Sequence, residues 1–325
     1  MKISTALCAL GIVCFGITCA GRALADGLEY DQIVFQSADA VAHPPGSFTN
    51  DLAANESATL DGELGTADSR KRLAALMAQA NDPAQKAAMM LAAQIPIFGT
   101  LGVMVARNAA NAMRAHLQEE GKGIGSAIHD AHAAEQRLGK WYHVVYRNGW
   151  TRREDVANQT VLIIKADQNQ RIFLDLALQT YYTTPATDSP TSEAAMRAVL
   201  CGPSTTVDGG KHALDGIDTE LFTSTFTAPE LTFTLTRYES QFTEPPKRDL
   251  AGNLIPFDCP SGASHTGPPM PTDRVALYST MVTSQGTMVV STLEETGNIK
   301  QVDEDPALFE IPAGFKEKSS GISGP

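Results

Sequence analysis

The chain has 325 residues and carries 37 acidic against 25 basic side chains, a formal net charge of −12. This balance argues against a nucleic-acid or anionic-membrane partner, whose binding requires clustered Lys and Arg. No G-x-S-x-G nucleophile elbow, phosphate-binding loop or H-E-x-x-H zinc motif occurs, so we expect a non-enzymatic protein without a cofactor or a metal.

Residues 1–25 have the pattern of a secretory signal. Lys2 precedes an uncharged apolar run over 3–20, and Ala23-Leu24-Ala25 supplies a small-x-small cleavage site before Asp26. We therefore expect cleavage between Ala25 and Asp26 and a periplasmic or secreted protein. Loss of Lys2 and Arg22 with the signal would change the net charge from −12 to −14. A lipid-anchored form is the alternative, although Thr18 before Cys19 departs from the usual anchor motif.

The cysteines point to one disulfide. Cys8, Cys14 and Cys19 would leave with the signal, and Cys201 and Cys259 would remain. In an oxidising compartment such a pair is most simply bridged, and closing a loop of about 59 residues would stabilise the fold by roughly 4 kcal/mol. Two buried free thiols are the alternative.

The first part of the mature chain changes from extended to helical character. Residues 26–66 are expected to form a first strand (28–36) followed by a polar linker. Residues 67–137 are rich in Ala, Met, Leu, Gln and Lys and predict a helical insertion. Its expected helices span 67–80, 83–94, 101–120 and 126–137, with the glycine-rich stretch 121–125 ending the third.

Residues 138–315 alternate in the manner of antiparallel strands. Asn148-Gly149 is the strongest hairpin signal, because both turn positions of that turn type require positive φ. Further strands are expected over 160–166, 171–176, 180–183, 220–227, 230–238, 274–281 and 287–294. A short helix is expected over 192–200, a loop over 244–271, and a disordered tail over 316–325.

Two segments of this region carry a family resemblance. They are "YRNGWTRREDVANQTVLIIKADQNQRIFLDLALQTYYTTP" (146–185) and "EETGNIKQVDEDPALFEIPAGF" (294–315). Together they resemble the superfamily of periplasmic lipoprotein carriers (LolA/LolB-like). There an arginine-bearing strand precedes a ligand-facing sheet, and the last strand ends in F-x-[IV]-P-x-G-[FY]. The matching positions here are Phe309, Ile311, Pro312, Gly314 and Phe315.

The resemblance covers residues 140–315 and implies an α+β fold. The expected architecture is a curved antiparallel half-open β-barrel with a helical insertion or lid, whose apolar cavity accepts acyl chains or an apolar partner segment. A curved sheet with too few strands to close must cover its apolar face with helices or a ligand. The long insertion and the expected disulfide are departures from the simplest members.

The apolar run 87–106 is the first candidate for ligand contact. It contains no charge over twenty residues but is interrupted by Pro96, Gly99 and Gly102. It can be a buried or lid-forming helical hairpin, a hairpin that touches a membrane surface, or a membrane span. Methionine adapts to varied ligands, so we expect an apolar wall that includes Met89, Met90, Leu91, Phe98 and Met104, with ordinary core packing as the alternative.

Charged and aromatic candidates lie on the expected strands and on the last helix. Arg152 and Arg153 are adjacent in a strand, so one should face each side of the sheet and Arg152 could hold a carboxylate or lipid phosphate. The alternative is an ion pair with Glu154 or Asp175. Phe233 is a further candidate for the cavity wall. His129, His132 and Glu135 have a spacing that can bind zinc, although solvated helix histidines are far commoner.

Two functions are consistent with these patterns. The first is an exported, non-enzymatic protein that binds an apolar small molecule, a lipid or an acylated protein in a half-barrel cavity. The second is a structural or interaction protein of the cell envelope that fills its own cavity, with possible membrane-surface contact through residues 87–106.

Overall fold

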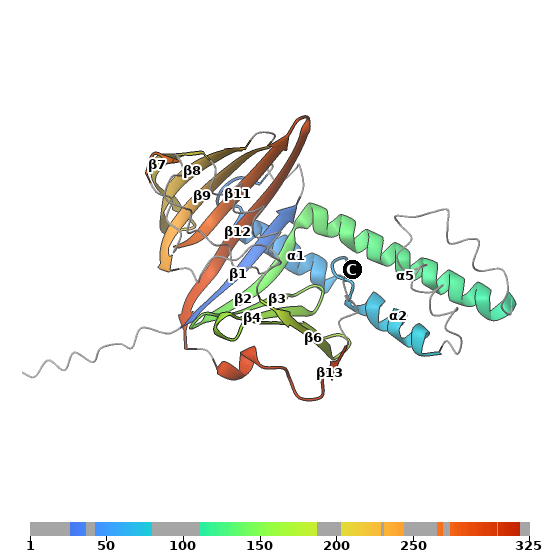
Figure 1. The fold of residues 1–325 in the computed structure, drawn as a ribbon. Helices are drawn as coiled ribbons and strands as arrows, with labels where there is room; N and C mark the ends of the chain where they lie inside the picture. Colours follow the sequence, from blue (N-terminus) through green and yellow to red (C-terminus); the bar gives the residue numbers. More distant parts are fainter. Residues whose placement is uncertain are drawn as a thin grey trace, which may run out of the picture.

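The computed structural model describes residues 27–36, 43–79, 111–186, 203–228, 231–243, 265–268, 274–303 and 305–318. These residues form one curved sheet of 13 strands in the order β10-β7-β8-β9-β11-β12-β1-β2-β3-β4-β5-β6-β13, with helices beside it (Figure 1). β10 and β13 end the order, so the sheet is not closed. Every pairing is antiparallel except those of β10 and β13 with their neighbours. The expectation of a curved, unclosed antiparallel sheet with helices is confirmed at this level.

One half of the sheet is a meander that follows the predicted hairpins. Its strands are β2 (Lys140–Arg147), β3 (Trp150–Asp155), β4 (Thr160–Lys165), β5 (Gln170–Asp175) and β6 (Thr180–Pro185). Asn148 and Gly149 have φ values of 46° and 85°, so the predicted Asn-Gly turn between β2 and β3 is confirmed. A 3-10 turn, η3 (Ala166–Gln168), joins β4 to β5.

In the other half, four strands are longer than the sequence predicts: β8 (Ile217–Ala228), β9 (Leu231–Thr243), β11 (Arg274–Gln285) and β12 (Met288–Val302). This half also contains β7 (Ser204–Leu214) and the two-residue β10 (His265–Thr266), which lies within the segment 244–271 that the sequence predicts to be a loop. β7 is absent from the sequence prediction, because its segment STTVDGGKHAL is almost wholly exposed and lacks apolar alternation. β1 (Gly27–Gln36) joins the two halves, since it pairs with β12 on one side and β2 on the other.

The described residues form three α-helices: α1 (Phe48–Leu60), α2 (Ala67–Gln79) and α5 (Asn111–Leu138). α1 corrects the prediction of a polar linker. Its Ala, Asn, Ser and Thr residues give little helical periodicity, but Phe48 and Leu52 pack against the sheet. α5 corrects the predicted stop at residues 121–125. Glycine costs a helix about 1 kcal/mol, and packing of Ile124 against Leu76 of α2 offsets that cost.

The end of the chain lies across the sheet. η4 (Pro306–Phe309) begins at Asp305, whose side chain accepts a hydrogen bond from the Ala307 amide. β13 (Lys316–Glu317) then pairs with β6, and the Lys316 and Lys318 amides donate to backbone carbonyls of the β5–β6 hairpin. The prediction of a disordered tail is therefore wrong for residues 316–318. We call residues 305–318 the C-terminal strap.

α1 and the strap cover the same face of the sheet, which we call the covered face. Phe48 and Leu52 of α1 join one apolar cluster with Ile33, Phe35 and Leu293. Phe309 of the strap is fully buried in a second cluster on β2, β4 and β5, with Ile311 and Phe315 packed beside it. The apolar residues of the closing motif therefore fill this face with the chain's own side chains.

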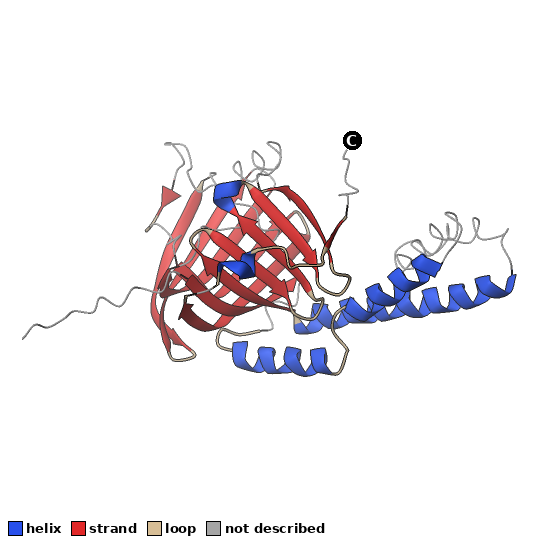
Figure 2. Cartoon of the chain, turned by 90° about the horizontal axis from the view of Figure 1, so that it is seen from below, coloured by secondary structure: helices blue, strands red, loops and turns tan. Residues whose placement is uncertain are grey.

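The insertion does not lie over the sheet in its described part. α2 and α5 pack together through Leu73, Leu76, Ile124 and Ile128. Figures 1 and 2 show this helix pair extending away from the body of the sheet. None of the helices in the described ranges has the length and apolarity to cross a membrane. The apolar run 87–106 lies outside those ranges.

Candidate functional site

A row of side chains crosses the other face of the sheet, from β1 to β6. Directly paired residues of neighbouring strands point to the same side of a sheet. The pairings run without interruption from one strand to the next. The members of the row are Tyr30, Val144, Arg153, Leu162, Phe173 and Tyr182. We call this face the row face.

The row is apolar and aromatic on both sides of one cation. The rings of Phe173 and Tyr182 stack with centroids 4.6 Å apart and an interplanar angle of 14°. The guanidinium carbon of Arg153 lies 3.6 Å from the ring centroid of Tyr142, its neighbour on β2. A cation over an aromatic face is attracted by the ring quadrupole.

The outer part of the row is only half-buried. Leu162, Phe173 and Tyr182 have intermediate exposure, and none of them belongs to an apolar cluster of the described residues. Val144 and Tyr30, at the β1 end, are buried together in a small cluster with Leu28 and Val275. The row therefore leads from a packed core to apolar surface that the described chain has not packed.

Burial raises the pKa of two tyrosines on this face, Tyr142 and Tyr182. For Tyr142, loss of hydration outweighs the opposing effect of Arg153. For Tyr182, the same desolvation outweighs Arg171. Both phenols stay protonated at neutral pH, where each offers an O–H donor beside an apolar ring.

The two adjacent arginines face opposite sides, as the strand period predicts. Arg152 points to the covered face, where its guanidinium pairs with Glu154 at 2.6 Å. Arg153 belongs to the row face. Asp175, the other predicted partner of Arg152, pairs with Arg70 of α2 at 3.3 Å. Because Arg152 and Arg153 are adjacent in a strand, the sequence predicts that they point to opposite faces of the sheet. It does not predict which face the rest of the chain covers.

Of the remaining residues predicted to contact a ligand, only Phe233 lies in the part of the chain that the structure describes. Phe233 points to the row face, with its ring centroid 5.4 Å from that of Phe226 on β8. Met89, Met90, Leu91, Phe98 and Met104 lie outside the described residues, as do Cys201 and Cys259.

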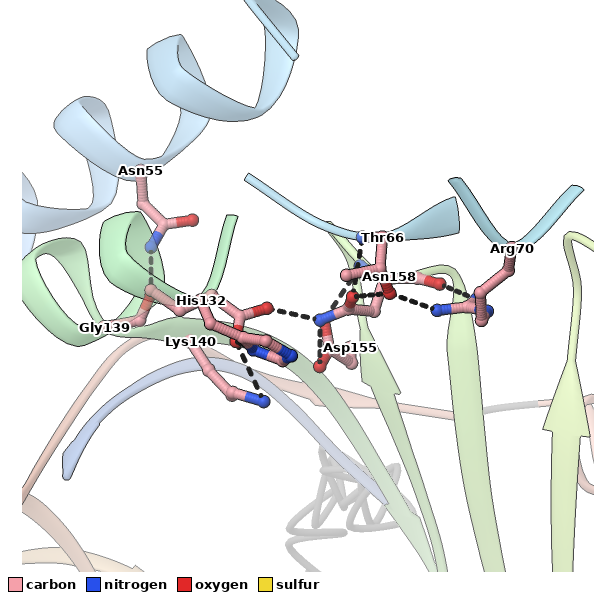
Figure 3. A network of polar contacts seen from close by, with 9 residues as sticks. Asn55, Thr66, Arg70, His132, Gly139, Lys140, Asp155 and Asn158 are labelled. Atoms are coloured by element: carbon pink, nitrogen blue, oxygen red, sulfur yellow. Dashed lines mark hydrogen bonds and ion pairs between the residues drawn. The ribbon is translucent and has the colours of Figure 1, made fainter. Parts of the chain in front are cut away.

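A polar network ties the helices to the β3–β4 turn at one end of the sheet (Figure 3). At its centre Asn158, 8% exposed, donates from Nδ2 to Glu135 at 2.7 Å and to Asp155 at 3.0 Å. Its Oδ1 accepts hydrogen bonds from the amide and hydroxyl of Thr66, both at 2.9 Å. Every polar atom of this amide therefore has a partner, and the turn holds the start of α2 and the end of α5 together.

The pKa values of the two carboxyl groups in the network are shifted in opposite directions. The pKa of Asp155 is raised because burial outweighs its bonds to Asn158. The pKa of Glu135 is lowered, since hydrogen bonds from Asn158 and His132 and the charge of Lys140 outweigh its burial.

His132 Nδ1 lies 3.2 Å from Glu135, whereas His129 is near Asp130. Among the described residues no group of three or more His, Cys, Asp or Glu side chains could hold a metal ion. The network is an anchor for the helices.

A surface depression of about 450 Å³ lies at the β4–β5 turn and the end of β6. Its lining is polar apart from one proline, and consists of Gln168, Asn169, Gln170, Thr183, Thr184 and Pro185. Such a lining does not suit an acyl chain, so the row face is the better candidate for apolar contact.

Comparisons with known proteins leave the family open. No family model and no curated protein matches the chain. Among solved structures, the crystal structure of the Mycobacterium tuberculosis lipoprotein LppX is similar over 49% of this chain and 75% of that chain, with 11% sequence identity and a TM-score of 0.26. A similarity of this size leaves the ligand to be argued from the chain's own residues, and the lipoprotein-carrier resemblance stays a prediction.

Proposed function

We propose that this is an exported, non-enzymatic protein that binds an apolar or amphipathic ligand, such as a lipid or the acyl chain of a partner, on the row face of its sheet. One observation carries the proposal. The covered face is filled by Phe309 and α1, whereas Leu162, Phe173 and Tyr182 form a half-buried apolar surface on the row face.

The chemistry of the row suits a chain-like apolar ligand. Binding would be driven by removal of apolar surface from water, worth about 25 cal/mol per Å². The stacked pair Phe173–Tyr182 offers flat surface, and Arg153 with the Tyr142 ring supplies polar atoms that could orient a headgroup.

Native mass spectrometry of protein purified from its own host tests the proposal. A retained lipid or acylated partner is the expected result. If the protein is free of any such ligand and also fails to bind a fluorescent fatty acid, the alternative of a structural or interaction protein of the envelope is favoured instead.

Variants of the row locate the binding surface. If a fatty acid removes about 50 Å² of each ring from water, the double change Phe173→Ala and Tyr182→Ala should cost about 2.5 kcal/mol of binding, a roughly 70-fold weaker Kd. The control is Val207→Ala, because Val207 is 59% exposed on β7 and far from the row in strand order. Equal affinities of the double variant and the control would place the ligand elsewhere.

Export belongs to the same proposal and has its own test. Amino-terminal sequencing of the protein from its host should begin at Asp26, and cell fractionation should find it outside the cytoplasm. A chain that retains Lys2 and Arg22 in the cytoplasm would contradict export without affecting the binding experiment.

A further inference from the structure

A carboxyl group is buried beneath the start of α1. Glu295 lies on β12, points to the covered face and is 1% exposed. Its neighbours at the same register are Ile33 on β1 and Tyr278 on β11. An ionised carboxylate in such a place must be paired with a cation or lose its charge.

The hydrogen bonds around Glu295 indicate that it holds a proton. The Ser47 hydroxyl lies 2.6 Å from Glu295 Oε1 and 2.9 Å from the Pro44 carbonyl oxygen. A hydroxyl has one hydrogen and can donate to one of these two acceptors. Both contacts are favourable if Glu295 donates its own proton to the Ser47 oxygen. The carboxylate of Asp51, on α1, is close enough to Glu295 to disfavour a second negative charge there.

The groups packed around Glu295 oppose its ionisation. Burial has the largest effect, and the carboxylates of Asp51 and Asp215 add to it. Together they outweigh the hydrogen bond to Ser47, which favours the ionised form, so that the pKa of Glu295 rises to about 8. On β11, burial and the proximity of Glu295 raise the pKa of Tyr278 to about 12. The titratable groups that face this site from the α1 segment, the β7–β8 turn, β9 and β11 are His43, Asp51, Asp215, Tyr238 and Tyr278.

The same contacts hold α1 on the sheet. The Tyr278 hydroxyl donates to the His43 carbonyl at 2.9 Å, His43 stacks on Phe35 at 4.0 Å, and its Nδ1 lies 3.1 Å from Asp51. Phe48 reaches the sheet at Gly297, where an added Cβ would lie 2.2 Å from the Phe48 ring. α1 therefore packs closely on β12, and Glu295 is buried between the two elements.

We propose that residues 43–60 form a proton-controlled latch, in which α1 stays docked on β12 while Glu295 is protonated and undocks when Glu295 ionises. An ionised Glu295 would repel Asp51, while water would solvate it once α1 has moved away. Undocking would expose Ile33, Phe35 and Leu293, the apolar residues that α1 now covers.

The direction of the pH dependence follows from the two states. Docked Glu295 binds its proton up to about pH 8, whereas in the undocked state its pKa returns to its ordinary value of 4.5. The undocking equilibrium constant should therefore rise about tenfold per pH unit between roughly pH 5 and pH 8 and level off above that range. The latch is tightest in acid and weakens as the pH rises.

Amide hydrogen exchange of the full chain from pH 5 to pH 9 tests the latch. Rates are corrected for the intrinsic pH dependence of exchange, and amides of β4 and β5 serve as the internal reference. In the wild type, protection of residues 48–60 should fall about 50-fold from pH 6 to pH 8, and these amides should exchange faster than those of β4 and β5 at every pH. Glu295→Gln, which cannot ionise, should remove this slope.

Glu294→Gln is the matched control, because Glu294 is the adjacent residue on β12 and points to the row face, where it accepts a hydrogen bond from Gln32. It should keep the wild-type slope. A level profile for α1 in the wild type, or an α1 profile equal to that of β4 and β5, would overturn the latch. These two outcomes need no variant, so the test holds even if Glu295→Gln fails to fold.

Discussion

Phe309→Ala should detach the C-terminal strap from the sheet and lower the free energy of unfolding by a measurable amount. Phe309 is fully buried against Val145, Ile163 and Ile172, and its ring centroid is 5.8 Å from that of Trp150 in an edge-to-face arrangement. Truncation of a buried Phe to Ala costs about 3–5 kcal/mol, from lost transfer energy and from the cavity left behind. We expect a value near 4 kcal/mol, because β-strand backbones on the other side of the cluster cannot move in to fill the space.

Urea unfolding followed by tryptophan fluorescence measures this loss. Leu308→Ala is the control, since Leu308 precedes Phe309 in the same turn but is 39% exposed; we expect a change within about 0.5 kcal/mol. Hydrogen exchange should also show lost protection of the Lys316 and Lys318 amides in Phe309→Ala, because their bonds to Gln179 and Tyr181 depend on the strap staying in place. If the two variants have equal stability, Phe309 does not hold the strap and the covered face is not closed by the chain's own residues.

Three further experiments test the polar network around Asn158, the packing of α1 on β12 and the expected disulfide. Asn158→Ala should lower the free energy of unfolding by about 2–3 kcal/mol, because Glu135, Asp155 and Thr66 lose a buried partner; the exposed Asn50→Ala should change it by less than about 0.5 kcal/mol in the same urea titration. Gly297→Ala should lower the free energy of unfolding by about 1–3 kcal/mol, because the added methyl group clashes with Phe48. In a double-mutant cycle, most of this loss should disappear when Phe48→Ala is already present. Additive effects would mean that the two residues do not touch. Thiol titration of the denatured, unreduced protein should find neither Cys201 nor Cys259 free, and reduction should lower the unfolding free energy by roughly 4 kcal/mol; two reactive thiols would refute the bridge.

Local patterns in the sequence predicted most of the meander. The Asn148-Gly149 turn and the alternation around it fix β2 to β6 almost residue by residue. The helices were harder to predict. α1 has few large apolar residues and is stabilised because Phe48 and Leu52 pack against β1 and against β12, a strand more than 200 residues later in the sequence. In the same way, α5 continues through Gly121, Gly123 and Gly125 because α2 packs beside it.

The candidate site illustrates a different limit of sequence reasoning. A period of two assigns Arg152 and Arg153 to opposite faces, but which face receives a ligand depends on what covers the other. That is decided by Phe309, more than 150 residues later, and by α1, which the sequence presents as a linker. Once those elements are placed, Arg152 is enclosed with Glu154, and Arg153 is left among Tyr142, Leu162 and Phe173.

The placement of Glu295 follows from the same argument about faces. In the sequence, Glu294 and Glu295 are two adjacent acids in a polar strand and have no distinguishing signal. Register places Glu295 opposite Ile33, under α1, and Glu294 opposite Val34 on the row face. In our proposal Glu295 keeps a proton at neutral pH, whereas Glu294 accepts a hydrogen bond from Gln32 on the other face. Glu295→Gln should therefore remove the pH dependence of α1 docking, and Glu294→Gln should leave it unchanged. A protein whose α1 exchange responds equally to Glu294→Gln and Glu295→Gln would show that the face of the strand does not control this ionisation.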